Sequence, residues 1–149
     1  MYVHAALAMP HELPGPRSRV PAIWIARPEC LRCGLCCIDT EMILTPSDIA
    51  RLEALGFKRE YFTVRDGRLY RLRNVDGRCV FFRNGRCVVY EYRPIGCSMY
   101  PIVIDAESGE VTVDEACPLA HTTSDAELER AKRYARLILA ELGLKGVKR

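Results

Sequence analysis

The sequence predicts a small, irregular α+β domain with short antiparallel β-hairpins and two main helices. Three observations lead to this class: two apolar stretches with helix caps, turn residues between short apolar stretches, and eight Cys among 149 residues. A chain of this length suffices for one domain with one core. We therefore expect a loose lead-in over residues 1–20, rich in Pro and polar residues, and a single domain over residues 21–149.

Two stretches carry the signals of amphipathic helices. The first follows Thr45, a residue type that favours a helix N-cap, and Gly56 is its natural stop. The second spans about residues 124–142 and begins with a capping box formed by Ser124 and Glu127. An apolar stripe with helical spacing follows this second cap. The stripe consists of Leu128, Ala131, Ala135, Ile138 and Leu142.

The middle of the chain is expected to form β structure. Asn84-Gly85 lies between two apolar stretches and is the strongest hairpin signal in the sequence. Ser108-Gly109 indicates a second hairpin. The expected strands cover residues 20–26, 41–44, 68–73, 78–82, 86–90, 102–105 and 110–113.

The most distinctive local feature is a C-x-x-C-x-x-C-C cluster, formed by Cys30, Cys33, Cys36 and Cys37. Two intervening residues allow a tight turn to direct two thiolates at one ion. Core packing does not account for four cysteines within eight residues, so we expect this domain to be built around a metal centre. The other cysteines, also expected to be metal ligands, are Cys79, Cys87, Cys97 and Cys117. Eight thiolates suffice for two tetrahedral sites or for one four-ligand cluster with spare residues.

The metal itself is either zinc or an iron–sulfur cluster, since both accept thiolate ligands. Glycine after Cys33 matches a zinc knuckle, whereas the C-x-x-C-x-x-C run with a distant Cys117 before Pro resembles bacterial ferredoxins. We favour an iron–sulfur cluster, with 4Fe-4S as one form, over zinc. Cys79 and Cys87 are expected on the two arms of one hairpin. The alternative to metal ligation by these two residues is a disulfide bond between them. His121 is a weaker ligand candidate, because the thiolates already suffice.

Composition points to a cytoplasmic protein. No apolar run approaches the roughly 18 residues of a membrane helix, and the start lacks the basic region of a secretory signal. Eight cysteines in that compartment disfavour simple disulfides, except in hyperthermophiles. The absence of Gln, with only two Asn, favours a thermophilic source and keeps the disulfide alternative open.

Charge is unevenly distributed along the chain. Residues 65–93 carry eight Arg against three acids, residues 94–129 carry eight acids and no Lys or Arg, and residues 130–149 carry seven basic residues against one acid. We expect neighbouring blocks to neutralise each other in the fold. Nucleic acid is the less favoured partner, because no basic motif interleaved with aromatic residues accompanies the charge. A protein partner of unknown identity is favoured, no membrane contact is expected, and the oligomeric state is open.

The cysteine cluster belongs to a longer pattern of motifs. A Leu-Thr-x-x-Asp-Ile helix start follows the cluster, and C-x-x-Y-x-x-R-P-x-x-C comes later in the chain. The residues that carry these motifs are Cys30, Cys33, Cys36, Cys37, Leu44, Thr45, Asp48, Ile49, Cys79, Cys87, Tyr90, Arg93, Pro94 and Cys97. Over residues 27–120 the chain resembles the YkgJ-type cysteine-cluster family of zinc- or iron-chelating domains. Ser98 stands where that family usually has Arg.

The resemblance implies metal chelation, and two further residues are expected at the centre. Arg93 is expected to neutralise thiolate charge and Tyr90 to donate a hydrogen bond to a ligand sulfur. The alternative role of Arg93 is to hold a turn, and that of Tyr90 is to pack on a strand. The favoured function is a metal-binding protein for electron transfer, cluster delivery or an accessory role. The alternatives are a cluster-dependent redox or protein-modifying enzyme, for which no catalytic constellation is indicated, and a zinc-stapled interaction module.

Overall fold

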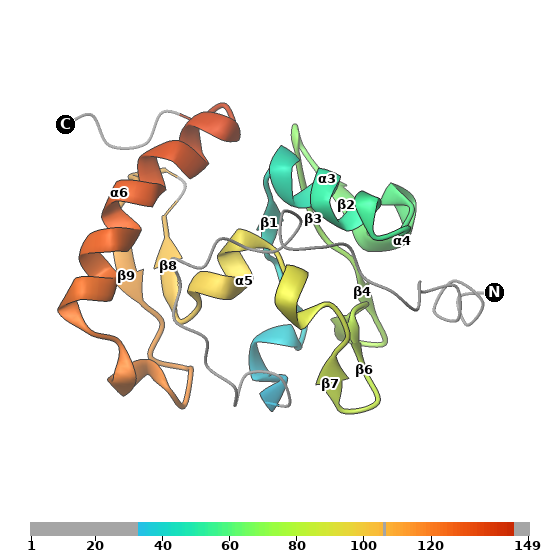
Figure 1. The fold of residues 1–149 in the computed structure, drawn as a ribbon, viewed down its shortest axis with the longest axis horizontal. Helices are drawn as coiled ribbons and strands as arrows, with labels where there is room; N and C mark the ends of the chain where they lie inside the picture. Colours follow the sequence, from blue (N-terminus) through green and yellow to red (C-terminus); the bar gives the residue numbers. More distant parts are fainter. Residues whose placement is uncertain (1–32, 106, 145–149) are drawn as a thin grey trace. The chain divides into compact units, whose positions relative to one another are not determined.

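The computed structural model describes residues 33–105 and 107–144. The lead-in, the strand expected over residues 20–26 and Cys30 lie outside the described residues. The chain forms two compact units, with their boundary between Ile95 and Gly96 (Figure 1). Both units combine helices with small antiparallel sheets, so the predicted α+β class is confirmed.

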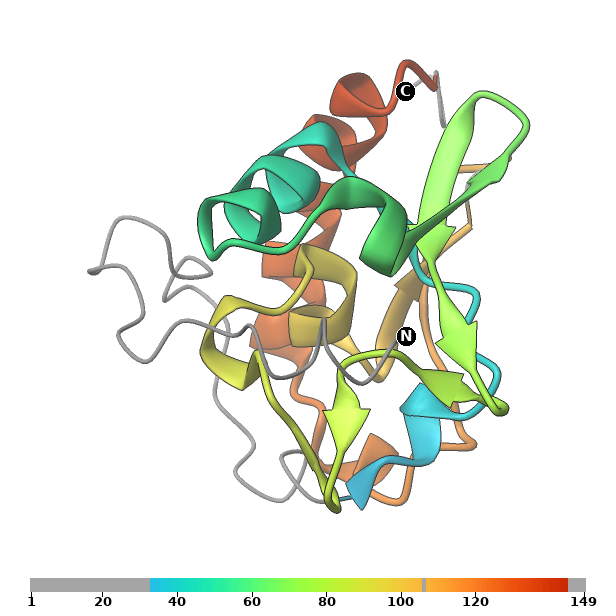
Figure 2. The same ribbon diagram turned by 90° about the vertical axis from the view of Figure 1, so that its right-hand side faces the viewer.

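The first unit contains a three-stranded antiparallel sheet with two helices beside it (Figures 1 and 2). Its strands are β1 (Ile43–Leu44), β2 (Thr63–Asp66) and β3 (Leu69–Leu72), in the order β1-β3-β2. The register pairs Leu44 with Tyr70 and Thr63 with Leu72. The helices are α3 (Pro46–Ala54) and α4 (Arg59–Phe62). The sequence indicated β1, β3 and α3 but not the β2–β3 hairpin, whose turn contains Gly67 with φ 64°.

Helix α3 begins as predicted. Thr45 is extended and its side chain accepts a hydrogen bond from the Asp48 amide, while the Asp48 carboxylate accepts one from the Thr45 amide. This reciprocal pair satisfies two backbone donors that a helix start leaves open. Ile49 and Leu52 bury the inner face of the helix.

Aromatic and aliphatic side chains fill the core of this unit. Phe81 is 1% exposed, and its ring lies 4.9 Å from that of Phe57, edge to face, and 5.7 Å from that of Phe62. Complete burial of such a side chain stabilises a fold by about 1.5–3 kcal/mol. The aromatic core therefore fixes the segment on either side of Phe81, where two of the cysteines lie.

Two short hairpins follow the sheet. Strands β4 (Asn74–Val75) and β5 (Arg78–Cys79) form the first, and β6 (Phe82–Arg83) and β7 (Arg86–Cys87) form the second. Each turns through two residues with positive φ, Asp76-Gly77 and Asn84-Gly85, which is typical of a type I′ turn. The hairpin at Asn84-Gly85 is thus confirmed.

The single strand expected over residues 78–82 is wrong, because the structure divides it between these two hairpins. Val80 and Phe81 are buried between the two parts, and their burial turns the chain away from regular pairing. Cys79 pairs with Asn74 and Cys87 pairs with Phe82. The expectation that the two cysteines face each other across one hairpin is therefore wrong as well.

The second unit consists of a hairpin and a long helix. Strands β8 (Ile102–Ile104) and β9 (Val111–Val113) pair as the sequence indicated, and α6 spans Asp125–Glu141. The capping box of Ser124 and Glu127 is present. Ala131 and Ala135 are buried as expected, but Leu139 and Glu127 complete the buried face in place of the half-buried Leu128, Ile138 and Leu142. Helix α5 (Ile95–Met99) crosses the boundary between the two units, and single 3-10 turns occur at Leu35–Cys37, Tyr90–Tyr92 and Ala120–Thr122.

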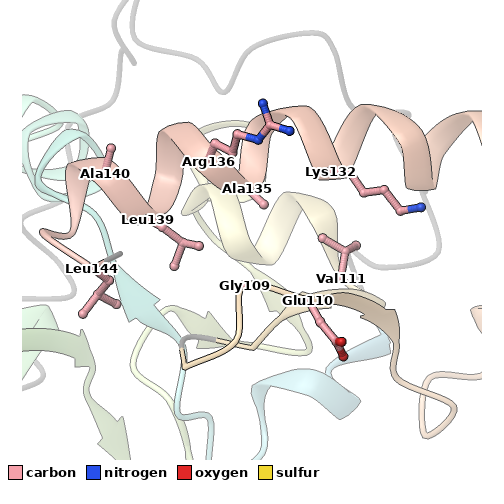
Figure 3. A pocket seen from close by; sticks show the side chains of 9 residues that line it. All are labelled: Gly109, Glu110, Val111, Lys132, Ala135, Arg136, Leu139, Ala140 and Leu144. Carbon is pink, nitrogen blue, oxygen red and sulfur yellow. The ribbon is translucent and has the colours of Figure 1, made fainter. Parts of the chain in front are cut away.

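A cavity of about 510 Å³ lies between α6 and the β8–β9 hairpin (Figure 3). Val111, Ala135 and Leu139 direct apolar side chains toward it, while Lys132 and Glu110 lie at its edge. No sequence-predicted ligand lines this cavity. Among the described residues, no helix has both the length and the apolar character needed to cross a membrane.

Candidate metal centre

The cysteine cluster of the described residues is a tight turn. We call Cys33–Ile38 the cysteine turn; it comprises Gly34 with φ 71° and a single 3-10 turn, η2 (Leu35–Cys37). The Cys37 amide donates to the Gly34 carbonyl at 3.1 Å, which closes the turn. Cys33 and Cys36 are exposed and Cys37 is half-buried. The expected tight turn is therefore present in its described part.

The cysteine turn is fastened to the first hairpin. Ile38 forms a β-bridge with Arg78, and the Asp39 amide donates to the Gly77 carbonyl at 2.8 Å. Thr40 and Asn74 exchange two further hydrogen bonds, of 3.1 and 3.0 Å. These contacts join residues 34 to 40 positions apart. They place the chain after Cys37 beside the strand that carries Cys79.

Gly34 brings the cysteine turn against the second hairpin. A Cβ atom added at Gly34 would lie 2.5 Å from Cζ of Phe82, well inside contact distance. The Phe82 ring also lies under the Arg78 guanidinium, 5.2 Å from its carbon. Glycine is required here both for the left-handed backbone and for the close approach.

Cys79 and Cys87 end equivalent strands and share a local geometry. Both follow a type I′ turn, and the Cys79 Sγ accepts a hydrogen bond from the amide of Phe81, two residues ahead, at 3.5 Å. The Cys87 thiol interacts in the same way with the backbone of Val89. Backbone N–H groups that point at a sulfur favour its thiolate form, which is the form that binds metals.

The same contact between a sulfur and the amide two residues ahead recurs in the second unit. The Cys117 Sγ accepts a hydrogen bond from the Leu119 amide at 3.4 Å, again two residues ahead. Cys97 lies in α5, and both cysteines are half-buried. His121 is exposed in η4 (Ala120–Thr122). Among the described residues, Cys79, Cys87 and Cys117 thus present sulfurs to which the amide two residues ahead donates, a feature that sequence spacing did not reveal.

Three thiols of the first unit have pKa values that are shifted in opposite directions. A hydrogen bond with Cys37 is the main cause that lowers the pKa of Cys36 to about 7. Partial desolvation of this exposed thiol by neighbouring protein atoms opposes the shift, and the charge of Arg93 adds to it. Burial raises the pKa of Cys79 to about 12 and also raises that of Cys87. Negative charge on Cys36 raises the pKa of both Cys79, which is buried, and Cys87, which is half-buried, so the three thiols act on one another electrostatically.

Arg93 and Tyr90 lie together, and Arg93 is near enough to Cys36 and Cys87 for its charge to act on both. The Arg93 guanidinium stacks on the Tyr90 ring, 4.0 Å from its centroid, and donates a hydrogen bond to the Tyr90 carbonyl. The positive charge of Arg93 lowers the pKa of both Cys36 and Cys87. A cation held on an aromatic face near several thiolates offsets their mutual repulsion. The hydrogen bond from Tyr90 to a ligand sulfur stays a prediction.

Asp48 has the structural role that the sequence indicated. It is fully buried, completes the α3 capping box, and accepts a hydrogen bond from Arg51. Sequence reasoning missed Arg51. Its spacing of three residues from Asp48 on one helix was the available signal.

The described thiols do not form a complete coordination sphere. Within residues 33–105 and 107–144, no group of three or more Cys, His, Asp or Glu is gathered closely enough to hold a metal ion. The seven cysteines in these ranges are not disulfide-bonded to one another. The donor set is nonetheless sulfur-rich, partly buried and supplied with N–H donors and a cation, which fits thiophilic metals such as zinc and iron.

The fold and these side chains define a small, cysteine-rich α+β protein with the thiol chemistry of a metal-chelating domain. The chain belongs to the CxxCxxCC family, described as "Putative zinc- or iron-chelating domain", whose model matches residues 29–130. This match includes all eight cysteines. Neither a curated protein nor a solved structure matches the chain.

Proposed function

We propose that this chain is a metal-binding protein that carries an iron–sulfur cluster, of the 4Fe-4S type, on its cysteine thiolates. The observation that supports it best is that Cys36, Cys79 and Cys87 act on one another electrostatically, while Arg93, stacked on Tyr90, acts on Cys36 and Cys87. Thiols that share one electrostatic environment with a cation suit a negatively charged cluster, which needs hydrogen bonds and positive charge around its sulfurs.

Both features are supplied by the chain's own residues. Amides donate to Cys79 and Cys117, and Arg93 provides the charge. We propose that Arg93 and Tyr90 flank the centre and that its ligands come from Cys30, Cys33, Cys36, Cys37, Cys79, Cys87, Cys97 and Cys117. Family membership covers the coarser property, chelation of zinc or iron.

The exposed cysteine turn favours a role that involves a partner. Cys33 and Cys36 are exposed, and the apolar side chains of Leu35 and Ile38 next to them are 50% and 45% exposed. A cluster with one accessible edge can pass an electron or the cluster itself to another protein. We therefore propose an accessory role in electron transfer or cluster delivery, with a protein as the partner.

Anaerobic purification followed by metal, sulfide and thiol analysis of one sample tests the proposal. We expect a brown protein with visible sulfide-to-iron charge-transfer absorbance and iron and sulfide in equal amounts. A colourless protein with stoichiometric zinc would overturn the iron–sulfur assignment. Metal-free protein without titratable thiols would overturn metal binding altogether.

Structural zinc is the second candidate, and the sheets favour it. Strands β4, β5, β6 and β7 have two residues each, too few to be stable on their own. A metal that joined their cysteines would stabilise both hairpins, since structural metal binding is coupled to folding. In that case zinc is retained after purification, and its removal unfolds the hairpins.

A further inference from the structure

Helix α3 carries a buried ion pair that the metal centre does not use directly. Asp48 and Arg51 lie one turn apart, with 2.7 Å between Oδ1 and Nη2. Their side chains are 1% and 12% exposed. Burying both charges costs free energy that an apolar pair would not, so such a pair is weak evidence for a role in stability alone.

The side chains of this ion pair form hydrogen bonds with a distant backbone segment, Tyr92 to Ile95, which we call the gripped segment. The Arg51 Nε donates to the Tyr92 carbonyl at 3.2 Å, and Nη2 donates to the Arg93 carbonyl at 3.0 Å. The Asp48 Oδ1 accepts from the Ile95 amide at 2.8 Å. Three backbone groups of the segment from Tyr92 to Ile95 are therefore bound by two side chains of one helix.

The gripped segment contains the cation of the metal centre. The Arg93 side chain folds back toward Tyr90, which precedes the segment. Its guanidinium stacks on the Tyr90 ring and donates a hydrogen bond to the Tyr90 carbonyl. Pro94 follows, is fully buried, and fixes the backbone on the other side of Arg93. The direction of the guanidinium is thus set by contacts on both sides of its Cα atom.

We propose that Asp48 and Arg51 are positioning residues for the metal centre, which hold the Arg93 guanidinium where the thiolates need a cation. This inference rests on the proposed function, since it assigns a role at the same centre. It adds two residues of helix α3, more than 40 positions before Arg93 in the chain, to the residues that shape the centre. It also explains why a charge pair is buried in that helix. Arginine is required at position 51 because a lysine ammonium, a single point of charge, cannot reach the carboxylate and two carbonyls with one planar fork.

The test is a double-mutant cycle on the full chain, with metal affinity measured by chelator competition. Arg51→Lys keeps the charge but loses the fork, and we expect it to weaken metal binding about tenfold, the size typical of residues that orient metal ligands. In an Arg93→Gln background the same change should have no further effect, because no guanidinium is left to position. Asp48→Asn should behave like Arg51→Lys.

Arg59→Lys is the matched control. Arg59 also pairs with a carboxylate of α3, Glu53 at 3.1 Å, but is exposed and does not contact the gripped segment. It should leave the affinity unchanged. Equal weakening by Arg51→Lys in both backgrounds would show a general structural role and overturn the inference while leaving the proposed function intact. A wild-type chain that binds neither iron nor zinc would overturn both.

Discussion

The cysteine turn and the two cysteine hairpins, residues 74–87, present thiols in opposite states. In the turn, Cys36 is exposed and its pKa falls to about 7. In the hairpins, Cys79 is 6% exposed and its pKa rises to about 12. The two thiols nevertheless influence each other electrostatically. One region therefore offers an accessible thiolate and the other a buried, protonated thiol.

This difference indicates an order of metal binding. We expect an incoming metal ion to meet Cys36 first, because its thiol is accessible and its pKa lies near neutrality. The hairpin thiols are then expected to lose their protons to the metal, so we predict that binding releases protons and strengthens as the pH rises. We therefore expect the exposed turn to serve metal entry and the hairpin cysteines to serve metal retention.

The largest expected effect is on thiol alkylation of the metal-free, reduced protein. The two pKa values, about 7 and about 12, differ by five, so the thiolate fraction at pH 7 is on the order of 10⁴–10⁵ higher for Cys36. The lower intrinsic reactivity of a low-pKa thiolate offsets part of this. Iodoacetamide labelling with mass spectrometry should show Cys36 reacting at least about a hundredfold faster than Cys79.

The pH profile sharpens this prediction. Labelling of Cys36 should reach half its maximal rate near pH 7, whereas labelling of Cys79 should keep rising toward pH 12 for as long as the fold persists. Denaturant should make the two rates similar, since both thiols then have ordinary pKa values. Equal labelling rates in the native protein would remove the distinction between the two regions.

The next largest effect is on stability. Cys33→Ser and Cys79→Ala should both abolish metal loading, and with it the stabilisation by bound metal, which reaches about 10 kcal/mol in small zinc domains. Without metal, the two variants should differ in their free energy of unfolding. Cys79→Ala should lower the free energy of unfolding by about 1–2 kcal/mol, because it removes a buried side chain, whereas Cys33→Ser changes an exposed one.

Denaturant unfolding of both variants, with and without metal, measures this. Retained metal and unchanged stability in Cys33→Ser would show that Cys33 is not a ligand. Matched losses in the metal-free proteins would show that the turn is as much a part of the core as the hairpins.

The sequence predicted the elements with strong local signals and missed those that depend on distant partners. The α3 cap at Thr45, the Asn84-Gly85 turn and the Ser124 capping box are fixed within four residues, and all three are present. Asp76-Gly77 carried an equally local signal that was overlooked, which is why residues 78–82 were expected to form one strand.

The candidate site divides in the same way. Spacing pointed to the cysteine residues and the family motif pointed to Arg93, since those motifs are local. The bridge from Ile38 to Arg78 and the contacts of Arg51 with Tyr92 join residues 40 and 41 positions apart. Such pairings depend on packing of the whole unit, so periodicity and spacing do not determine them.

A smaller effect is expected where the cysteine turn meets the hairpins. Gly34→Ala should destabilise the protein by about 2–4 kcal/mol, because alanine is strained at φ 71° and its Cβ would overlap the Phe82 ring. The variant should also weaken metal binding, since the turn must move away from Phe82. Denaturant unfolding and chelator competition on the same sample measure both. A stability change as small as that of an open glycine site would show that the two regions do not depend on this contact.

Such a site exists in the second hairpin, and it carries the smallest expected effect. Gly85 has φ 77°, close to the value at Gly34, but a Cβ added there meets nothing within 4 Å. Gly85→Ala therefore measures backbone strain alone, about 1–2 kcal/mol for a left-handed residue. Subtracting its effect from that of Gly34→Ala isolates the steric term. If that difference exceeds about 1 kcal/mol, Phe82 is the physical link between the accessible thiolates and the buried thiols. Replacing the ring by a smaller side chain, with Phe82→Leu in the Gly34→Ala background, should then recover part of the lost stability. The same change in the Gly85→Ala background should only add a further loss of stability.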